Sequence, residues 1–351
     1  MADTMRAGLV GVTGYTGMEL VRILASHPGM ELVQVTSRKE AGQRLCAIYP
    51  FLQGMPVGEL TISLPDIDQL AKDCDIIFLA IPHGLAMEMG ADLVERGCKV
   101  VDLSADFRIR DRAVYEEWYK VPHTRAHMIA EAVYGLPELY ADKVRPARLV
   151  ANPGCYPTAS ILGLYPALKN GLVSHENVVI DAKSGTTGAG RTLKTNTLFC
   201  EMHDSFRAYG LGTHRHTPEI EQELSLIAGA DMTISFNPHI LPVNRGILAT
   251  IYTSLLSPLS TKEVHAAYAR EYENHPFVRV LPVGSLPELR NVRGTMLCDI
   301  GLVVDKRTNR LIIVSAIDNL CRGASGQAVA NANLMLGLPL DLGLNFAPLV
   351  P

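Results

Sequence analysis

The residue best suited to covalent chemistry is Cys155, in the segment NPGCYPT (residues 152–158). This segment joins an expected strand, RLVA (148–151), to an apolar run typical of a helix, ASILGLYPAL (159–168). Cys155 is therefore expected at a helix N-terminus, where the helix dipole and open N–H groups favour a thiolate. The same N–H groups can hold an oxyanion formed on an attacked carbonyl. The pattern predicts a nucleophilic cysteine, and we interpret the other six cysteines as structural.

A second segment, GTHRHTPEI (212–220), supplies two histidines for acid–base work, His214 and His216. Thioester chemistry needs such a group beside the nucleophile. Zinc ligation by the pair is an alternative, but no cysteine or further histidine lies nearby, so we expect no metal. One histidine is expected to be catalytic and the other supporting; we favour His214, and the choice stays open. His123 and His127, with helical spacing, are interpreted as surface residues.

Glycines at positions 8, 11, 14 and 17 cross the first expected strand, turn and helix. Glycine there permits a tight turn and close approach of a phosphate to backbone N–H groups at the helix start. The spacing is GxxGxxG rather than GxGxxG. Its position after the first strand of the chain nevertheless favours a dinucleotide site.

The end of the second expected strand indicates which dinucleotide is bound. It reads Thr36-Ser37-Arg38-Lys39, with no acidic residue to hold a ribose 2′-hydroxyl. An acid would repel a 2′-phosphate, whereas Ser37 and Arg38 can bind it. We therefore predict NADP (as NADPH) rather than NAD.

The elements that position these residues fall into two groups. Apolar strands at 6–11, 31–36, 75–81 and 99–105 alternate with helix-like stretches, which predicts a Rossmann-type doubly wound parallel sheet. Beyond residue 150 the strands are longer and more alternating, as in an α+β domain with a mixed or antiparallel sheet. We expect an NADP-binding Rossmann domain over 1–150, completed by the C-terminal helix at about 322–351, and a catalytic and dimerisation domain over 151–321.

Composition excludes several classes of partner. The 351 residues are 48% hydrophobic and 19% charged, with a net charge of −4 and no basic tract, so no nucleic-acid partner is expected. No stretch resembles a signal peptide or a membrane span. Seven cysteines without CxxC spacing fit reduced thiols. We expect a cytoplasmic protein that binds a small molecule.

Several motifs together resemble the N-acetyl-gamma-glutamyl-phosphate reductase family, which is similar to the aspartate-semialdehyde dehydrogenase group. The motifs are GVTGYTGMEL (11–20), LSADFR (103–108), NPGCYPT (152–158), SGTTGAGR (184–191), GTHRHTPEI (212–220), LPVNRGIL (241–248) and AIDNLCRGASGQAVANANLMLG (316–337). The resemblance extends over nearly the whole chain. One departure is Arg322, where the family often has lysine; the charge is kept.

The resemblance implies an NADPH-dependent reduction of N-acetyl-gamma-glutamyl phosphate to N-acetyl-glutamate 5-semialdehyde and phosphate, in arginine biosynthesis. Cys155 matches the catalytic cysteine, and His214 lies in the proposed acid–base region. The expected cofactor contacts are Gly11, Thr13, Gly14, Tyr15, Thr16, Gly17, Ser37, Arg38, Pro82, Ser184, Gly185 and Asn319.

An acyl phosphate that also carries a carboxylate needs guanidinium groups for recognition. Arg108 and Arg245 are expected to bind these anions, and Asn152 to contact substrate; which arginine takes which anion stays open. The rivals are a related reductase of lysine biosynthesis acting on carrier-linked aminoadipyl phosphate, aspartate-semialdehyde dehydrogenase, and a non-catalytic NADPH-sensing regulator. Long apolar strands in the second half suggest a homodimer or homotetramer.

Overall fold

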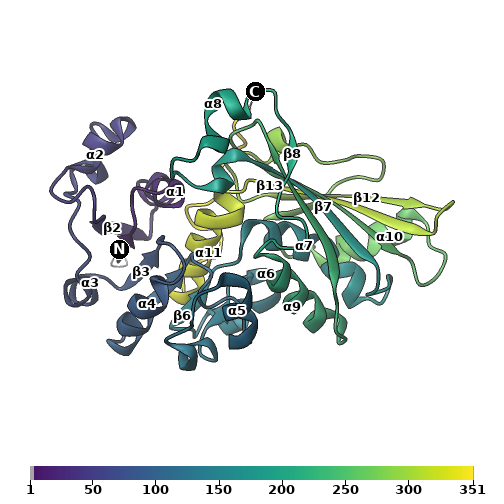
Figure 1. The fold of residues 1–351 in the computed structure, drawn as a ribbon, viewed down its shortest axis with the longest axis horizontal. Helices are drawn as coiled ribbons and strands as arrows, with labels where there is room; N and C mark the ends of the chain where they lie inside the picture. The colour runs from purple at the N-terminus through teal and green to yellow at the C-terminus, as the bar shows by residue number, and fades with distance from the viewer. Residues whose placement is uncertain (1–3, 351) are drawn as a thin grey trace. The chain divides into compact units, whose positions relative to one another are not determined.

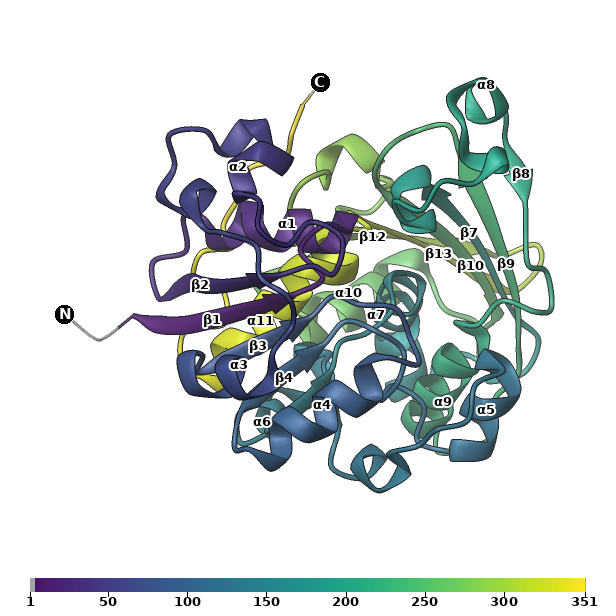
Figure 2. The ribbon, with the colours of Figure 1, turned by 60° about the vertical axis from the view of Figure 1, so that its left-hand side comes forward.

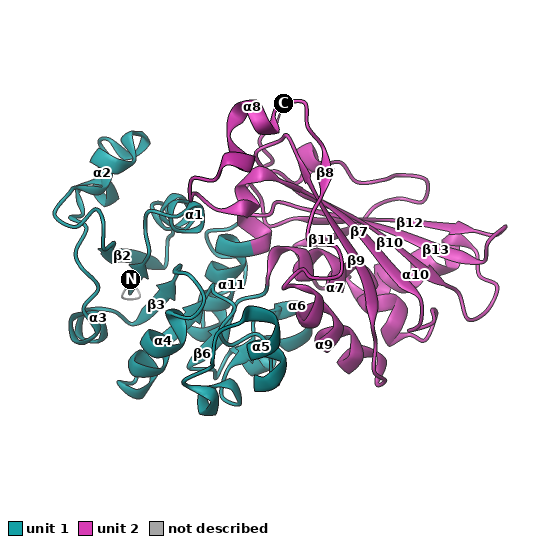
Figure 3. Ribbon diagram, viewed as in Figure 1, with its two compact units in different colours: residues 1–153, 324–345 teal, residues 154–323, 346–351 magenta. Residues whose placement is uncertain are grey.

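The computed structural model describes residues 4–350, and the chain divides into two compact units. Unit 1 runs to Pro153 and resumes over Ala324–Asn345, whereas unit 2 comprises Gly154–Gly323 and the residues from Phe346 onward (Figure 3). From the sequence, the C-terminal residues to 351 are expected in the first domain. The structure instead ties the tail to unit 2, because Leu349 N donates to Arg293 O at 2.9 Å.

Unit 1 is built on six parallel strands: β1 (Met5–Val10), β2 (Met30–Thr36), β3 (Ile76–Leu79), β4 (Lys99–Asp102), β5 (Val133–Tyr134) and β6 (Leu149–Ala151). Their order is β2-β1-β3-β4-β6-β5, so the chain reverses direction across the sheet between β1 and β3. Ligands of such sheets bind at this switch point, beyond the carboxyl ends of the strands. The predicted doubly wound sheet is confirmed.

The helices of unit 1 are α1 (Tyr15–Leu24), α2 (Leu45–Ile48), α3 (Ile67–Asp73), α4 (Ala86–Glu95), α5 (Arg112–Tyr119), α6 (Pro137–Val144) and α11 (Gly326–Met335). α3 and α4 lie on one face, and α1 and α11 lie on the other (Figure 2). α11 comes from the far end of the sequence, and all ten of its residues are buried. Burial on both faces explains why all four residues of β3 (IIFL) are apolar.

Unit 2 contains a seven-stranded mixed sheet: β7 (Val178–Gly185), β8 (Arg207–Ala208), β9 (Ile234–Leu241), β10 (Ile247–Ser254), β11 (Val278–Val280), β12 (Cys298–Asp305) and β13 (Arg310–Ile317). The order is β11-β12-β13-β10-β7-β9-β8. Strands β7, β8, β12 and β13 of this sheet are labelled in Figure 1. The β7–β9 and β11–β12 pairs are parallel, and the other pairs are antiparallel. The predicted mixed sheet is confirmed.

The helices of unit 2 are α7 (Cys155–Lys169), α8 (Phe199–Met202), α9 (Thr217–Ala228) and α10 (Thr261–Glu271). α7 packs on β10 and β13 and contacts α9 and α10. Twelve of its fifteen residues are buried, so the helix is apolar around most of its circumference and forms the centre of the core. Among residues 4–350, no helix is both long enough and apolar enough to span a bilayer.

Candidate active site

The predicted nucleophile begins a helix. Cys155 is the first residue of α7, and Gly154 is the N-cap, with extended backbone angles of φ −68° and ψ 156°. Cys155 is partly buried rather than sealed in the core. The thiol therefore lies where the helix dipole and first-turn N–H groups stabilise negative charge, as the sequence predicted.

Two residues of the histidine segment contact Gly154, the glycine before Cys155. The buried carboxylate of Glu219, in the first turn of α9, accepts a hydrogen bond from Gly154 N at 2.8 Å. A methyl group added at Gly154 would lie 2.6 Å from His216 Nε2, so the imidazole packs directly on this glycine. Gly323 approaches from another direction, because a methyl group there would lie 2.6 Å from Cys155 Cβ. Glycine is needed at both positions for this packing.

The two predicted histidines lie side by side, with ring centroids 5.0 Å apart. They occupy a turn rather than an extended strand. The backbone N–H of His216 donates to His214 Nδ1 at 3.1 Å, so that nitrogen carries no proton. Burial, with a smaller contribution from the positive charge of Arg215, lowers the pKa of His214 to about 4. At neutral pH His214 is therefore a neutral imidazole with its proton on Nε2, able to donate a hydrogen bond from that atom.

Aromatic side chains enclose His214. Its ring centroid lies 5.5 Å from that of Tyr156, 5.5 Å from that of Tyr209 and 5.3 Å from that of Phe236. Tyr156 Oη donates to His239 O at 3.2 Å and lies 3.0 Å from the Tyr209 hydroxyl. Burial raises the pKa of Tyr209 to about 12, so this phenol stays protonated at neutral pH.

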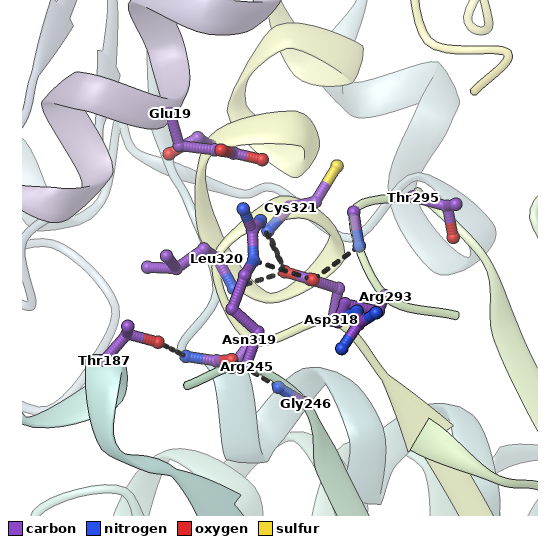
Figure 4. Close-up of polar contacts among 12 residues, drawn as sticks. Glu19, Thr187, Arg245, Gly246, Arg293, Thr295, Asp318, Asn319, Leu320 and Cys321 are labelled. Carbon is purple, nitrogen blue, oxygen red and sulfur yellow. Dashed lines mark hydrogen bonds and ion pairs between the residues drawn. The ribbon is translucent and has the colours of Figure 1, made fainter. Parts of the chain in front are cut away.

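A second polar cluster in unit 2 is centred on Asp318, which is fully buried just after β13 (Figure 4). Its carboxylate forms a bidentate pair with Arg245, at 2.9 Å to Nε and 2.8 Å to Nη2. The same oxygens accept N–H bonds from Gly294, Leu320 and Cys321 at 2.7 to 2.9 Å. The predicted anion binder Arg245 is thus held in one orientation.

The predicted cofactor residues of unit 2 gather beside this cluster. Asn319 Oδ1 accepts from Gly246 N at 2.7 Å, and its Nδ2 donates to Thr187 Oγ1 at 2.9 Å (Figure 4). Gly185 N donates to Gly246 O at 2.8 Å. Ser184 precedes Gly185 at the end of β7, and its hydroxyl donates to Gly185 O at 3.0 Å.

The predicted dinucleotide turn of unit 1 connects β1 to α1. Gly11 has φ +91°, and a methyl group there would overlap Ala80 O. A methyl group at Gly17 would lie 2.7 Å from Val12 O, so the helix packs tightly on the turn. Thr13, Gly14, Tyr15 and Thr16 span the helix start, where Gly14 is the N-cap and offers no capping side chain. The first-turn N–H groups are thus suited to bind a phosphate.

Residues at the ends of β2 and β3 border this turn. Ser37 is buried and Arg38 is exposed, directly after β2. Thr36 Oγ1 is buried and has no hydrogen-bond partner among the described residues. Pro82 follows β3 and is exposed. A switch-point turn of this kind, with an unsatisfied hydroxyl beside it, fits a dinucleotide.

Arg108 and Asn152 lie after β4 and β6, at the same edge of the sheet. Arg108 is 8% exposed; its Nε donates to Asn152 O at 2.7 Å and its Nη2 to Leu103 O at 2.9 Å. The Asn152 amide donates to Ala324 O at 3.1 Å and accepts from Asn331 Nδ2 at 3.1 Å. Both side chains therefore also fix the backbone that leads into the nucleophile turn.

Sequence reasoning missed Glu219, Asp318 and Asp106. Asp106 is buried, and its carboxylate accepts from Gly84 N, Met87 N and Tyr115 Oη at 2.6 to 2.9 Å, which shapes the loop after Pro82. The sequence feature that could have indicated them is an acidic residue inside an otherwise apolar or motif-bearing segment. Such a segment is expected to be buried, and a buried acid is rare unless it is hydrogen-bonded.

The surface interpretation of His123 was wrong. Its side chain is 2% exposed, and its Nε2 lies 2.7 Å from Asp106 O. His127 lies in the next short 3₁₀-helix and is exposed. Across residues 4–350, no group of three histidine, cysteine, aspartate or glutamate residues is arranged to hold a metal ion.

Comparison with known proteins identifies the family. Residues 6–147 match the family model described as "Semialdehyde dehydrogenase, NAD binding domain", and residues 155–319 match "Semialdehyde dehydrogenase, dimerisation domain". The N-acetyl-gamma-glutamyl-phosphate reductase of Desulforudis audaxviator is 52% identical over 347 residues, covering 99% of this chain and 100% of that protein. The chain belongs to the N-acetyl-gamma-glutamyl-phosphate reductase family.

Other relatives carry the same name, and solved structures share the fold. The enzymes of the same name from Pelotomaculum thermopropionicum and Geobacter sulfurreducens are 50% and 51% identical, each over 99% of this chain. Aspartate semialdehyde dehydrogenase II from Vibrio cholerae has the same fold, with a TM-score of 0.72 at 15% identity over 96% of this chain and 99% of that chain. The enzyme from Candida albicans, solved with NADP, has a TM-score of 0.68 at 17% identity, covering 95% of this chain and 99% of that chain.

Proposed function

We propose that this chain reduces N-acetyl-gamma-glutamyl phosphate to N-acetyl-glutamate 5-semialdehyde and phosphate with NADPH, as a step of arginine biosynthesis in the cytoplasm. The observation that carries the proposal is Cys155 at the first position of α7, in a chain about 50% identical to reductases of that name. The relatives' names do not favour the lysine-pathway or aspartate-semialdehyde alternatives.

The chemistry begins with the thiolate. Cys155 attacks the acyl-phosphate carbonyl, the carbon–oxygen bond to phosphate breaks, and a thioester remains on the sulfur. The thioester carbonyl carbon then accepts a hydride from NADPH. The resulting oxyanion collapses, expelling the Cys155 thiolate and releasing the aldehyde. First-turn N–H groups of α7 are suited to hold that oxyanion.

The two histidines take different roles in this proposal. His214 presents a neutral Nε2–H, because its Nδ1 accepts from the His216 backbone and its pKa is lowered to about 4. It is suited to donate a hydrogen bond to developing negative charge. His216 packs on Gly154 beside Cys155 and is the better candidate to take the proton that the Cys155 thiol loses when it becomes a thiolate. This reverses the preference for His214 drawn from the sequence.

Anion recognition is assigned to arginines. We retain Arg108 and Arg245 for the phosphate and carboxylate of the substrate, with Asn152 in a supporting position. Arg245 is preoriented by the bidentate pair with Asp318, which reduces the entropy lost when it binds an anion.

Cofactor preference is assigned to the end of β2. The family model and the NADP-bound relative support use of a pyridine nucleotide. We propose NADP because Ser37 and Arg38 follow β2 with no acidic residue at that position. Arg38→Ala should raise the KM for NADPH about tenfold while leaving the KM for NADH unchanged, since only NADPH carries the 2′-phosphate.

We also propose a homodimer or homotetramer assembled through unit 2. The supporting features are the match to a dimerisation domain and a set of exposed apolar side chains between β7 and α9. These side chains are Leu193, Leu198, Phe199, Phe206 and Leu211. Light scattering during gel filtration should give at least twice 38.2 kDa.

The decisive experiment is phosphate-dependent reduction of NADP⁺, run in the reverse direction with N-acetyl-glutamate semialdehyde beside aspartate semialdehyde. The wild type should use the first substrate and not the second. Cys155→Ser should lose at least 10³-fold of that rate, because serine is not ionised at neutral pH. Full turnover by Cys155→Ser, or a preference for aspartate semialdehyde, would refute the proposal.

A further inference from the structure

Glu219 is a buried acid that contacts the nucleophile turn. It is 0% exposed, and its Oε1 accepts from Gly154 N at 2.8 Å. The residue lies in the first turn of α9, and α9 packs against α7, which starts at Cys155. One carboxylate therefore links the start of the histidine helix to the start of the nucleophile helix.

The energetics favour a specific role for this acid. Burying a carboxylate is costly unless hydrogen bonds and positive potential compensate. Its place in the first turn of α9 gives Glu219 the favourable end of that helix dipole, and the bond to Gly154 N is charge-assisted. Burial and bonding restrict the carboxylate to one geometry.

That geometry is transmitted to the thiol through one peptide unit. Gly154 is the N-cap of α7, so the orientation of its peptide fixes the direction in which the first turn and Cys155 begin. His216 packs on the same glycine. The histidine segment therefore holds Gly154 both at its N–H and at its Cα.

We propose that Glu219 is a positioning residue: by holding the Gly154 N–H, its carboxylate presents Cys155 for attack. The inference rests on the proposed function for the role of Cys155. It extends that function by giving Glu219 a role that it exerts through the Gly154 N–H.

Two substitutions separate the hydrogen bond from the charge. Glu219→Gln keeps a carbonyl oxygen that can accept from Gly154 N but removes the negative charge. Glu219→Ala removes both. Glu223, also 0% exposed and one turn further along α9, provides the matched control as Glu223→Gln.

The substrate-independent readout is alkylation of Cys155 by iodoacetamide, followed by mass spectrometry of its peptide across pH 5 to 10. Other titratable groups around the turn are His214, His216, Tyr156 and Tyr209. Glu219→Gln should shift the alkylation midpoint to lower pH, because a nearby negative charge no longer opposes the thiolate. Glu219→Ala should also slow alkylation at its high-pH plateau, because the thiol is less well presented.

The kinetic readout is the separation of kcat from KM. Glu219→Ala should lower kcat about 10- to 100-fold and leave the KM for NADPH unchanged, with the thermal midpoint checked for folding. Glu219→Gln should retain most of kcat. Glu223→Gln should match wild type in alkylation.

The outcomes separate this inference from the proposed function. Wild-type alkylation and kcat in Glu219→Ala would overturn the positioning role while leaving the reductase proposal intact. A wild type that is inactive with the acyl-phosphate couple, yet shows the Glu219-dependent alkylation shift, would overturn the reductase and keep the positioning role. A Glu223→Gln shift equal to that of Glu219→Gln would also overturn the inference.

Discussion

The protonation of His214 gives the sharpest prediction about this site. Its imidazole is surrounded by Tyr156, Tyr209 and Phe236, and its Nδ1 accepts the His216 N–H. If His214 Nδ1 were protonated, its N–H and the backbone N–H of His216 would point at each other in a partly desolvated space. Burial first, and Arg215 second, therefore lower the pKa of His214 from its ordinary 6.5 to about 4.

The protonated fraction of His214 and its effect on stability follow from these two pKa values. At pH 6.5 an ordinary histidine is half protonated, whereas a pKa of about 4 leaves about one His214 in 300 protonated. The unfolded chain binds this proton first as pH falls. The contribution of neutral His214 to the free energy of unfolding is therefore complete above about pH 6.5. It is lost as pH falls towards 4, and the total loss is at most about 3 kcal/mol.

The assay is NMR titration of a histidine-labelled sample between pH 8 and pH 5. The His214 signal is assigned by its absence in His214→Asn. Asparagine is chosen because its side chain can place an oxygen near the position of Nδ1. That signal should stay at its neutral shift throughout this range. Denaturation at pH 7 and pH 4.5 should show a smaller acid-induced loss of stability in His214→Asn than in wild type.

Two results would refute this reasoning. A His214 signal that titrates with a midpoint near 6.5 would show that the ring is solvated. Equal acid sensitivity of wild type and His214→Asn would show that its protonation is not coupled to folding. In either case His214 would again be the favoured candidate for the acid–base group.

Two further predictions concern the positions that support the sites. Gly17→Ala puts a methyl group 2.7 Å from Val12 O, so it should destabilise unit 1 by about 1–3 kcal/mol and raise the KM for NADPH at least tenfold. Thermal melting and titration with NADPH test both effects. The control is Gly14→Ala, whose methyl group meets nothing nearer than 3.9 Å and should leave the melting midpoint unchanged. Asp318→Asn removes a buried charge that holds Arg245 and should cost about 3–5 kcal/mol in denaturant unfolding; a loss below about 1 kcal/mol would contradict a central role.

Local pattern was sufficient for much of this protein. The apolar runs, the glycine turn at Gly11 and Gly17, and the Pro-Gly-Cys junction each depend on neighbouring residues only. Strand burial, close packing of glycine and the start of a helix are local properties, so they could be predicted. The position of Cys155 at a helix start and the doubly wound sheet followed from them.

Tertiary structure decided what depends on partners distant in sequence. Glu219 meets Gly154 across 65 positions, and Asp318 meets Arg245 across 73. The protonation of His214 likewise depends on aromatic rings contributed by α7 and β9. Burial and hydrogen-bond partners set the cost of a charge, and neither exists until the chain has folded. The sequence by itself thus determined which atoms could react, and the fold determined how they are oriented and charged.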